Sequence, residues 1–354
     1  MFEFPQEYQR ILPDQSTAAS VIDLSDATTK SAANGLTKKQ LTLIRSSRLL
    51  PEWIMMDPVS PLLFRETPSL PGQYLRALLH RQKPSSQNSL PALAALQSHV
   101  MPDVHHVKAY AELCGFNASL STLPITYPHM LAFPLHMELM LHKRFPLALI
   151  GLVHIRNRIT QYRGIQPHET LSIYCVLSGQ RNTAKGLEFD ITSQVCSAGE
   201  LVWQSVSTNL ARLRSSTNSN NSNGKAAEQK RTREPLPPHY ALHSQWSLPE
   251  DLGRRYAKVS GDSNPIHLWP ASAKLLGFKR HIAHGMWSKA RLAATLYPQP
   301  DSEACTLDVE FKQPVFLPSK VCLFTDPDLS GQFYVADAER LQCYLRGVIQ
   351  EGSY

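Results

Sequence analysis

One segment in the C-terminal third carries an acid, a base and a glycine at a spacing that suits catalysis. Residues 256–267 are Tyr-Ala-Lys-Val-Ser-Gly-Asp-Ser-Asn-Pro-Ile-His, and residues 283–286 are Ala-His-Gly-Met. Asp262 and His267 could hold one water molecule, so that one side chain handles the proton on oxygen and the other handles the proton on carbon. Gly285, at a helix N-terminus, could donate its N–H to a carbonyl oxygen that gains negative charge as an enolate forms. Together these groups have the chemistry to add or remove water next to a carbonyl.

Helical periodicity and turn residues predict how this segment is held. Apolar residues recur at helical spacing over Leu248–Ser260, and Ser247-Leu-Pro-Glu250 has the pattern of a capping box, so we expect a helix that ends at Gly261. A short helix over Pro270–Leu276 and a largely buried helix over Gly285–Leu296 are expected to follow. The acid and the base would then lie on the loop between the first two helices, where a proline keeps the chain extended.

Spacing alone leaves open whether this Asp-x-Asn-Pro segment is catalytic or an ordinary turn, and a resemblance favours catalysis. The motifs resemble the hallmark of the MaoC-like family of (R)-specific enoyl-CoA hydratases and acyl dehydratases, which is Tyr-Ala-x-x-Ser-Gly-Asp-x-Asn-Pro-Ile/Leu-His and then Ala-His-Gly-Met. Residues 309–318 are similar to the strand that follows the family's central helix. The resemblance implies that Asp262 and His267 are the catalytic pair and that the N–H of Gly285 binds the substrate carbonyl.

Further residues of the same region are assigned to substrate binding. Asn264, His284 and Met286 belong to the matched motifs, and Asn264 is also expected to brace the loop through turn hydrogen bonds. Two positions depart from the family pattern, because Trp269 stands where an acidic residue is frequent and Ala293 stands where some relatives have serine. These departures bear on the choice of substrate more than on the reaction.

The resemblance also implies an α+β fold, a tandem (double) hot-dog in which each half is a curved antiparallel β-sheet wrapped around a central helix. Residues 110–117 and 127–141 repeat the order of the catalytic motif and its helix, which indicates an internal duplication. In this first copy Phe116 replaces the aspartate, Met130 replaces the glycine, and Pro134 is expected to interrupt the helix. We therefore expect the first copy to be catalytically silent and to shape the acyl tunnel.

Composition and alternation divide the chain into five parts. Residues 214–234 have almost no apolar side chains, so they cannot form a core. This composition predicts a flexible linker. Equivalent strands are expected over Gly151–Ile159 and Thr306–Val315, one in each copy. The expected organisation is a disordered tail over 1–45, a short helical lead-in over 46–97, a non-catalytic hot-dog over 98–212, a linker over 213–238 and a catalytic hot-dog over 239–354.

The formal net charge of +7 is spread along the chain. It could serve solubility alone, or it could attract an anionic carrier such as the phosphates of CoA or of a phosphopantetheine arm. Lys279, Arg280, Lys289 and Lys312 are near the proposed site in sequence and are the candidates for that contact. No recognised nucleic-acid-binding motif is visible. The expected partner is therefore an acyl-CoA or acyl-carrier thioester, and pairing of two chains into a homodimer is left open.

No cofactor and no metal site are expected. The six cysteines show no Cys-x-x-Cys pairing and are expected to be reduced thiols. The first residues lack the pattern of a signal peptide, and the longest apolar run, Phe145–Ile155, contains a proline and a glycine and is too short to span a bilayer. The resulting expectation is a cytoplasmic protein without membrane insertion.

The resemblance implies an enzyme, a hydro-lyase. It would hydrate trans-2-enoyl thioesters to (R)-3-hydroxyacyl thioesters or run the reverse dehydration. A hot-dog acyl thioesterase is the alternative among enzymes, and it would release a free thiol. A non-catalytic acyl-thioester-binding subunit is the alternative from another class, and the intact Asp-x-Asn-Pro-x-His at residues 262–267 argues against it.

Overall fold

The computed structural model describes residues 59–79, 89–117, 121–149, 151–212, 239–297, 304–328, 331–340 and 342–352. The tail predicted over 1–45 and the linker predicted over 213–238 lie outside these described residues. The description therefore begins within the predicted lead-in and continues through both predicted copies.

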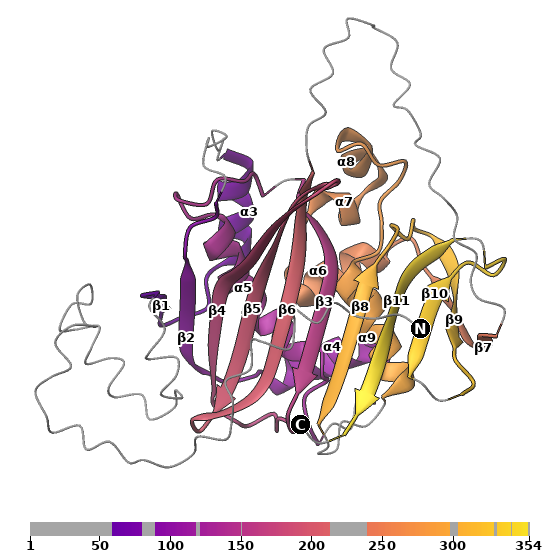
Figure 1. Ribbon diagram of the computed structural model, residues 1–354, viewed down its shortest axis with the longest axis horizontal. Helices are drawn as coiled ribbons and strands as arrows, with labels where there is room; N and C mark the ends of the chain where they lie inside the picture. The colour runs from indigo at the N-terminus through magenta and orange to yellow at the C-terminus, as the bar shows by residue number, and fades with distance from the viewer. Residues whose placement is uncertain are drawn as a thin grey trace, which may run out of the picture.

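The strands of the described residues form one sheet of 11 strands (Figure 1). Neighbouring strands are antiparallel, except that β1 runs parallel to β2. The N-terminal half contributes the first six strands in spatial order, and the C-terminal half contributes the other five. In that order the strands are β1 (Leu62–Phe64), β2 (Ala94–Val100), β4 (Leu171–Thr183), β5 (Gly186–Ser197), β6 (Glu200–Arg212), β3 (Val153–Gln161), β8 (Cys305–Phe311), β11 (Cys343–Glu351), β10 (Gln332–Ala336), β9 (Ser319–Thr325) and β7 (Ala241–Leu248).

The two halves meet where β3 pairs with β8. Ile159 lies opposite Leu307 and Asn157 lies opposite Val309, and all four residues are fully buried. Side chains alternate between the two faces of a strand, so these residues share the face that is turned to the core. Equivalent strands of the two copies therefore join the halves into one continuous sheet.

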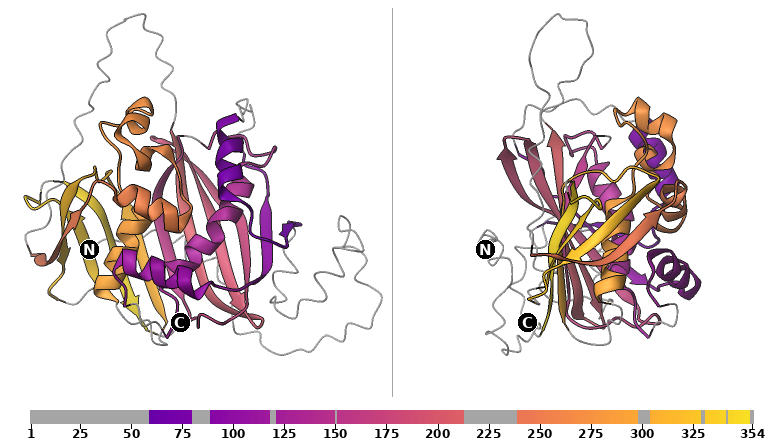
Figure 2. Two further views of the ribbon diagram at one scale, coloured as in Figure 1. Left: turned by 180° about the vertical axis from the view of Figure 1, so that it is seen from behind. Right: turned by 90° about the vertical axis from the view of Figure 1, so that its right-hand side faces the viewer.

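The helices cover one face of this sheet (Figure 2). In the first copy, α5 (Tyr127–Met140) packs against β2, β4 and β5. In the second, α9 (Gly285–Leu296) packs against β8 and against α4 (Val104–Cys114) of the first copy. Helix α4 and its counterpart α6 (Leu252–Ser260) both end at a glycine with a left-handed backbone. Both halves thus have the element order that the duplication predicts.

One apolar core runs through both halves. Leu135 and Met137 of α5 and Leu292 and Ala293 of α9 are among its most buried members. Burial of a large aliphatic side chain contributes roughly 1.5–3 kcal/mol, so this shared core holds both central helices to the sheet. Among the residues that the structure describes, none of the helices combines the length and the apolarity that crossing a bilayer requires.

The predicted start of α6 is wrong. Ser247 and Leu248 are the last residues of β7, where they pair with β9, so α6 begins at Leu252. The predicted capping box does not form, and the N-cap residue Asp251 makes no side-chain capping hydrogen bond. A strand pairing that links distant residues has therefore overridden a local helix-start signal.

The expected interruption at Pro134 is also wrong, because α5 continues through this residue. A proline inside a helix removes one backbone hydrogen bond. Here most of α5 is buried, so packing against the sheet offsets that loss. The strand predicted over Gly151–Ile159 is β3, and the strand predicted over Thr306–Val315 is the shorter β8, which ends before Pro314.

The predicted lead-in over 46–97 is only partly helical within the described residues. It contains α3 (Leu70–Leu79) and also β1, and the boundary expected at residue 97 falls inside β2. Strand β2 pairs with β4, so it belongs to the sheet of the N-terminal half. The division of the chain into domains stays a prediction.

Candidate active site

Asp262 lies directly after α6, where the chain turns. Gly261 ends the helix with a φ of 73°, a left-handed conformation that suits glycine. The N–H of Asp262 donates to Oγ of Ser260 at 3.1 Å. The carboxylate is half-buried, with 29% of the side chain exposed. The turn therefore fixes the backbone and keeps the carboxylate accessible.

His267 lies on a short helical turn, α7 (Pro265–Leu268), and not on the predicted loop. Asn264 begins this turn in an extended conformation, and its side chain accepts a hydrogen bond from the N–H of Ile266 at 3.3 Å. Pro265 suits the first helical position because it needs no hydrogen-bond partner for its nitrogen. Asn264 thus braces the segment as expected, and His267 is buried behind it.

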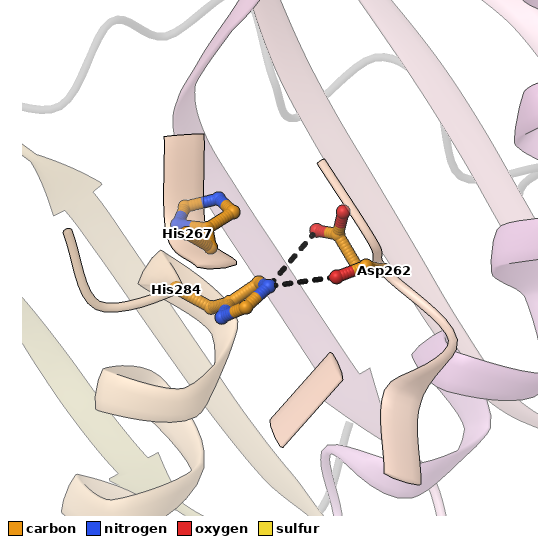
Figure 3. Close-up of side chains that lie close together, drawn as sticks. All are labelled: Asp262, His267 and His284. Atoms are coloured by element: carbon orange, nitrogen blue, oxygen red, sulfur yellow. Dashed lines mark hydrogen bonds and ion pairs between the residues drawn. The ribbon is translucent and has the colours of Figure 1, made fainter. Parts of the chain in front are cut away.

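A second imidazole, from His284, completes the cluster (Figure 3). Its ring stacks on that of His267, with centroids 3.7 Å apart and planes 25° apart. Its Nε2 donates to the backbone oxygen of Asp262 at 2.9 Å and lies 3.8 Å from Oδ2 of that residue. His284 was expected to bind substrate. That expectation stays a prediction; in the structure the His284 side chain is only 2% exposed and contacts both other members of the cluster.

The hydrogen bonds fix where each imidazole carries its proton. Nδ1 of His267 lies 2.8 Å from the carbonyl oxygen of Ile282, and a carbonyl can only accept, so Nδ1 carries the hydrogen. Nε2 of neutral His267 therefore has a free lone pair and can act as a base. By the same reasoning the hydrogen of His284 is on Nε2.

Burial sets the charge of the three groups. It lowers the pKa of His267 to about 3, an effect that nearby His284 increases, and it also lowers the pKa of His284. Burial alone would raise the pKa of Asp262. The two histidines and the hydrogen bonds from Tyr74 and the Asn264 N–H outweigh it, so this pKa is below its usual range. Near neutral pH the site thus holds an ionised carboxylate and two neutral imidazoles.

Gly285 is the first residue of α9, directly after His284. Its N–H has no hydrogen-bond partner within the described residues, as expected for the first turn of a helix. A Cβ added at this position would lie 3.0 Å from the ring of Phe311. Glycine at this position therefore lets the Phe311 ring pack closely against the N-terminus of the buried helix.

Tyr74 contacts Asp262, and the sequence does not indicate this contact. It lies on α3, 188 residues before Asp262, and its hydroxyl donates to Oδ1 of that residue at 2.5 Å. The described lead-in helix was predicted, but nothing in its sequence points to the catalytic motif. Only the tertiary fold brings the two residues together.

The basic residues predicted to contact an anionic carrier differ in position. Lys279 and Arg280 are exposed on the bend between α8 (Pro270–Leu275) and the residues before α9. Lys312 forms an ion pair with Glu310 at 2.8 Å. Lys289 contradicts the prediction, because it is fully buried. Its Nζ lies within 2.9 Å of three acceptors, which are the carbonyl oxygen and Oδ1 of Asn157 and the carbonyl oxygen of Leu307.

Met286 lies on the first turn of α9, half-buried against the core. Donor atoms of Asp262, His267 and His284 lie within 4.8 Å of one another, a spacing at which three ligands could hold a metal ion. The geometry fits this poorly. Nε2 of His284 is occupied by its own hydrogen, and the two imidazole rings are stacked face to face. The arrangement fits acid–base chemistry better.

The region of this cluster is similar to known proteins. Residues 223–325 match the model of the MaoC like domain, a range that includes the whole cluster. The chain is 36% identical over 223 residues to 3-hydroxyacyl-thioester dehydratase X of Mycobacterium tuberculosis, a match that covers 63% of this chain and 76% of that protein.

Solved structures extend the similarity beyond the C-terminal half. The crystal structure of HtdX from Mycobacterium tuberculosis matches with a TM-score of 0.61 and 28% identity, over 73% of this chain and 99% of that one. A MaoC-like dehydratase from Phytophthora capsici matches with a TM-score of 0.54 and 17% identity, over 74% of this chain and 96% of that one, which shows the fold alone. The predicted α+β double hot-dog fold is confirmed, and the chain belongs to the MaoC-like dehydratase family.

Proposed function

We propose that this protein is a hydro-lyase that interconverts (R)-3-hydroxyacyl thioesters and trans-2-enoyl thioesters, with Asp262 and His267 as its catalytic pair. The carrying observation is geometric: the Asp262 carboxylate and the His267 ring present donor atoms within 4.8 Å of one another, and the hydrogen bond from Nδ1 of His267 to Ile282 leaves its Nε2 free. The similarity to a relative named as a 3-hydroxyacyl-thioester dehydratase supports the same reaction.

In the dehydration direction, Nε2 of His267 takes the proton from Cα of the substrate. The electron pair moves toward the thioester carbonyl, whose oxygen receives a hydrogen bond from the N–H of Gly285. The pair then forms the Cα–Cβ double bond as the Cβ–O bond breaks. The imidazolium returns its proton to the departing hydroxyl, which leaves as water, so atoms and charge balance. Hydration is the reverse sequence.

Asp262 has two tasks in this scheme. Its carboxylate accepts a hydrogen bond from the hydroxyl or water and so holds that oxygen over the acyl chain. Its negative charge also stabilises the imidazolium that forms for a moment on His267. A group positioned for proton transfer contributes roughly 10²–10⁴-fold in rate, and one oxyanion donor contributes about 3 kcal/mol to transition-state stabilisation.

Substrate contacts are proposed for a second group of residues. Met286 would pack against the acyl chain, and Asn264 would act through the shape of its turn. Lys279 and Arg280 would attract the phosphates of CoA or of a phosphopantetheine arm, since both are exposed close in sequence to the catalytic helix. Lys312 would join them although it is paired with Glu310, because an exposed ion pair of this kind is weak and exchanges partners readily.

The experiment that tests this proposal follows the absorbance of the conjugated thioester during hydration of crotonyl-CoA, octenoyl-CoA and a branched enoyl-CoA. Asp262→Asn and His267→Gln should each lower kcat by at least about 10²-fold. Asp251→Asn is the matched control, since it makes the same change at the other end of α6, where no capping hydrogen bond exists. Wild-type activity in both site variants would overturn the assignment.

The same reactions distinguish the alternatives. A thioesterase would release free CoA thiol, which a thiol reagent detects, and a non-catalytic subunit would bind the enoyl thioester without turnover. Neither has a specific observation in its favour here. An ionised carboxylate beside a neutral imidazole is suited to moving protons on the acyl chain, which is why the hydro-lyase is preferred.

Location, domain organisation and assembly are also proposals. We propose a catalytic hot-dog over 239–354 and a non-catalytic one over 98–212, and residence in the cytoplasm. Cys114, Cys175, Cys196, Cys305 and Cys322 are free thiols, which supports a reducing compartment. A homodimer of the double hot-dog would leave the site intact, since the cluster is complete within one chain. Light scattering of the purified protein decides between monomer and dimer.

A further inference from the structure

Helix α3 is fixed to the central helix of the N-terminal half. Nε2 of Gln73 donates to the carbonyl oxygen of Pro134 at 2.9 Å and to Oε1 of Glu138 at 2.8 Å. Arg76, one turn further on, forms an ion pair with the same glutamate at 2.8 Å. Gln73 is almost fully buried, so its two hydrogen bonds are shielded from water. This side of α3 is therefore anchored on α5.

The same helix also contacts the catalytic turn. Leu70 lies so close to Gly261 that a Cβ added there would be 2.2 Å from Cδ1 of the leucine. The Tyr74 hydroxyl donates to Oδ1 of Asp262 at 2.5 Å. Helix α3 thus connects the central helix of one half to the catalytic carboxylate of the other.

The two oxygens of Asp262 have different surroundings. Oδ1 accepts hydrogen bonds from the Tyr74 hydroxyl and from the N–H of Asn264 at 3.2 Å. Near Oδ2, His284 Nε2 is 3.8 Å away, and its hydrogen is directed to the backbone oxygen of Asp262. Oδ2 therefore keeps its capacity to accept a hydrogen bond from water or from a substrate hydroxyl.

We propose that Tyr74 is a positioning residue for the reaction: it holds Oδ1 of Asp262 and thereby leaves Oδ2 to bind the reacting water or hydroxyl. This proposal rests on the proposed function and deepens it. It also assigns a role in the reaction to the N-terminal half, because Tyr74 belongs to that half. Residues 223–325, which match the family's domain model, do not include it. The half that lacks the catalytic motif would then be needed for the arrangement of the catalytic carboxylate.

The electrostatic surroundings support this role. The titratable groups that act on Asp262 are Tyr74 from α3, Tyr256 from α6, His267 from α7, His284 before α9 and His154 from β3. Burial raises the pKa of the Tyr74 phenol well above its usual value, so the phenol remains a donor. Its hydrogen bond is one of the effects that hold the pKa of Asp262 down.

The test is Tyr74→Phe in the full-length protein, which removes the hydroxyl and keeps the ring. Loss of a donor to the charged form raises the pKa of Asp262, so the acidic limb of the kcat/KM profile should move to higher pH by about one unit. We expect kcat to fall about tenfold with KM unchanged, because Tyr74 acts through the carboxylate. An unshifted limb with kcat within about twofold of wild type would overturn the proposal.

Arg76→Gln is the matched control on the same helix. It removes the ion pair with Glu138 and keeps the phenol, so it should leave the pH profile unchanged. An equal shift in this variant would mean that packing of α3 is responsible, and the proposal would fail. If thermal unfolding shows that Tyr74→Phe is poorly folded, a fluorotyrosine at position 74 replaces it. This stronger donor of similar shape should move the limb to lower pH, and an unmoved limb counts against the proposal.

A second readout does not depend on turnover. The carboxyl carbon of Asp262, labelled with ¹³C, reports its own titration by NMR in wild type and in Tyr74→Phe. If wild type hydrates no enoyl thioester, the proposed function fails, and this titration still decides the role of Tyr74. A higher pKa of Asp262 in the variant supports the contact as described, and an equal pKa overturns it.

Discussion

Gly253, on α6, should control the distance between the acid and the base although it belongs to neither motif. A Cβ added at this position would lie 1.9 Å from the backbone oxygen of His267. Cβ atoms essentially never approach another atom more closely than 3.0 Å, so in Gly253→Ala helices α6 and α7 must separate by about 1.1 Å. The obstacle is backbone on both sides, so no side-chain rotation relieves it.

This separation acts directly on the catalytic pair. Asp262 directly follows α6 and His267 lies on α7, so their separation changes whichever helix moves. A displacement of about 1 Å in a catalytic geometry can lower the rate roughly 10²-fold. We therefore expect Gly253→Ala to lower kcat about 100-fold.

The assay is hydration of crotonyl-CoA, combined with thermal unfolding to show that the variant is folded. Gly72→Ala is the matched control, since a Cβ at position 72 would come no closer than 3.8 Å to its neighbours. It should retain wild-type kcat. A folded Gly253→Ala variant with wild-type kcat would refute the reasoning, because the two helices would then tolerate a shift without harm to the reaction.

Three other predictions concern the core and the oxyanion site. Lys289→Met leaves three buried acceptors without their donor and should lower the free energy of unfolding by roughly 2–3 kcal/mol, measured with urea. His136 and His267, each with a pKa lowered by burial to about 3, stay neutral when the unfolded chain is protonated. The free energy of unfolding should therefore fall by about 1.4 kcal/mol per histidine for each unit that the pH is lowered from about 6.5 to about 3. Urea midpoints should accordingly be lower at pH 5 than at pH 7. Gly285→Ala should lower kcat about tenfold, and Phe311→Leu should restore part of it, because the added Cβ meets that ring.

Features set by neighbouring residues could be predicted from the sequence. The left-handed end of α6 at Gly261, the extended Asn264 before Pro265 and the start of α9 at Gly285 all follow from residue types within one or two turns. The resemblance then identified which of these turns could be catalytic. The local shape of the candidate site was therefore available before the structure.

Features set by tertiary contacts could not be predicted. Ser247 and Leu248 have a local helix-start pattern, yet they pair with β9 and so belong to β7. Lys289 is surrounded by small and apolar residues in sequence, which indicates a buried helix but not the acceptors on β3 and β8 that the amine finds there. The Tyr74–Asp262 contact joins residues 188 positions apart, and no local pattern encodes such a pair.

The first copy lacks the Asp-x-Asn-Pro-x-His motif, yet it contacts the central helix of the second copy. That copy supplies β3, the pairing partner of β8, and Asn157, which holds the Lys289 amine of the central catalytic helix. Helix α3, which precedes that copy, supplies the hydroxyl on Oδ1 of Asp262. Without these contacts the buried amine on α9 would lose two of its three acceptors, and the carboxylate would lose one of the two donors to its Oδ1. The N-terminal half, which has Phe116 and Met130 at the positions matched to Asp262 and Gly285, thus still contacts the helix and the carboxylate of the proposed site.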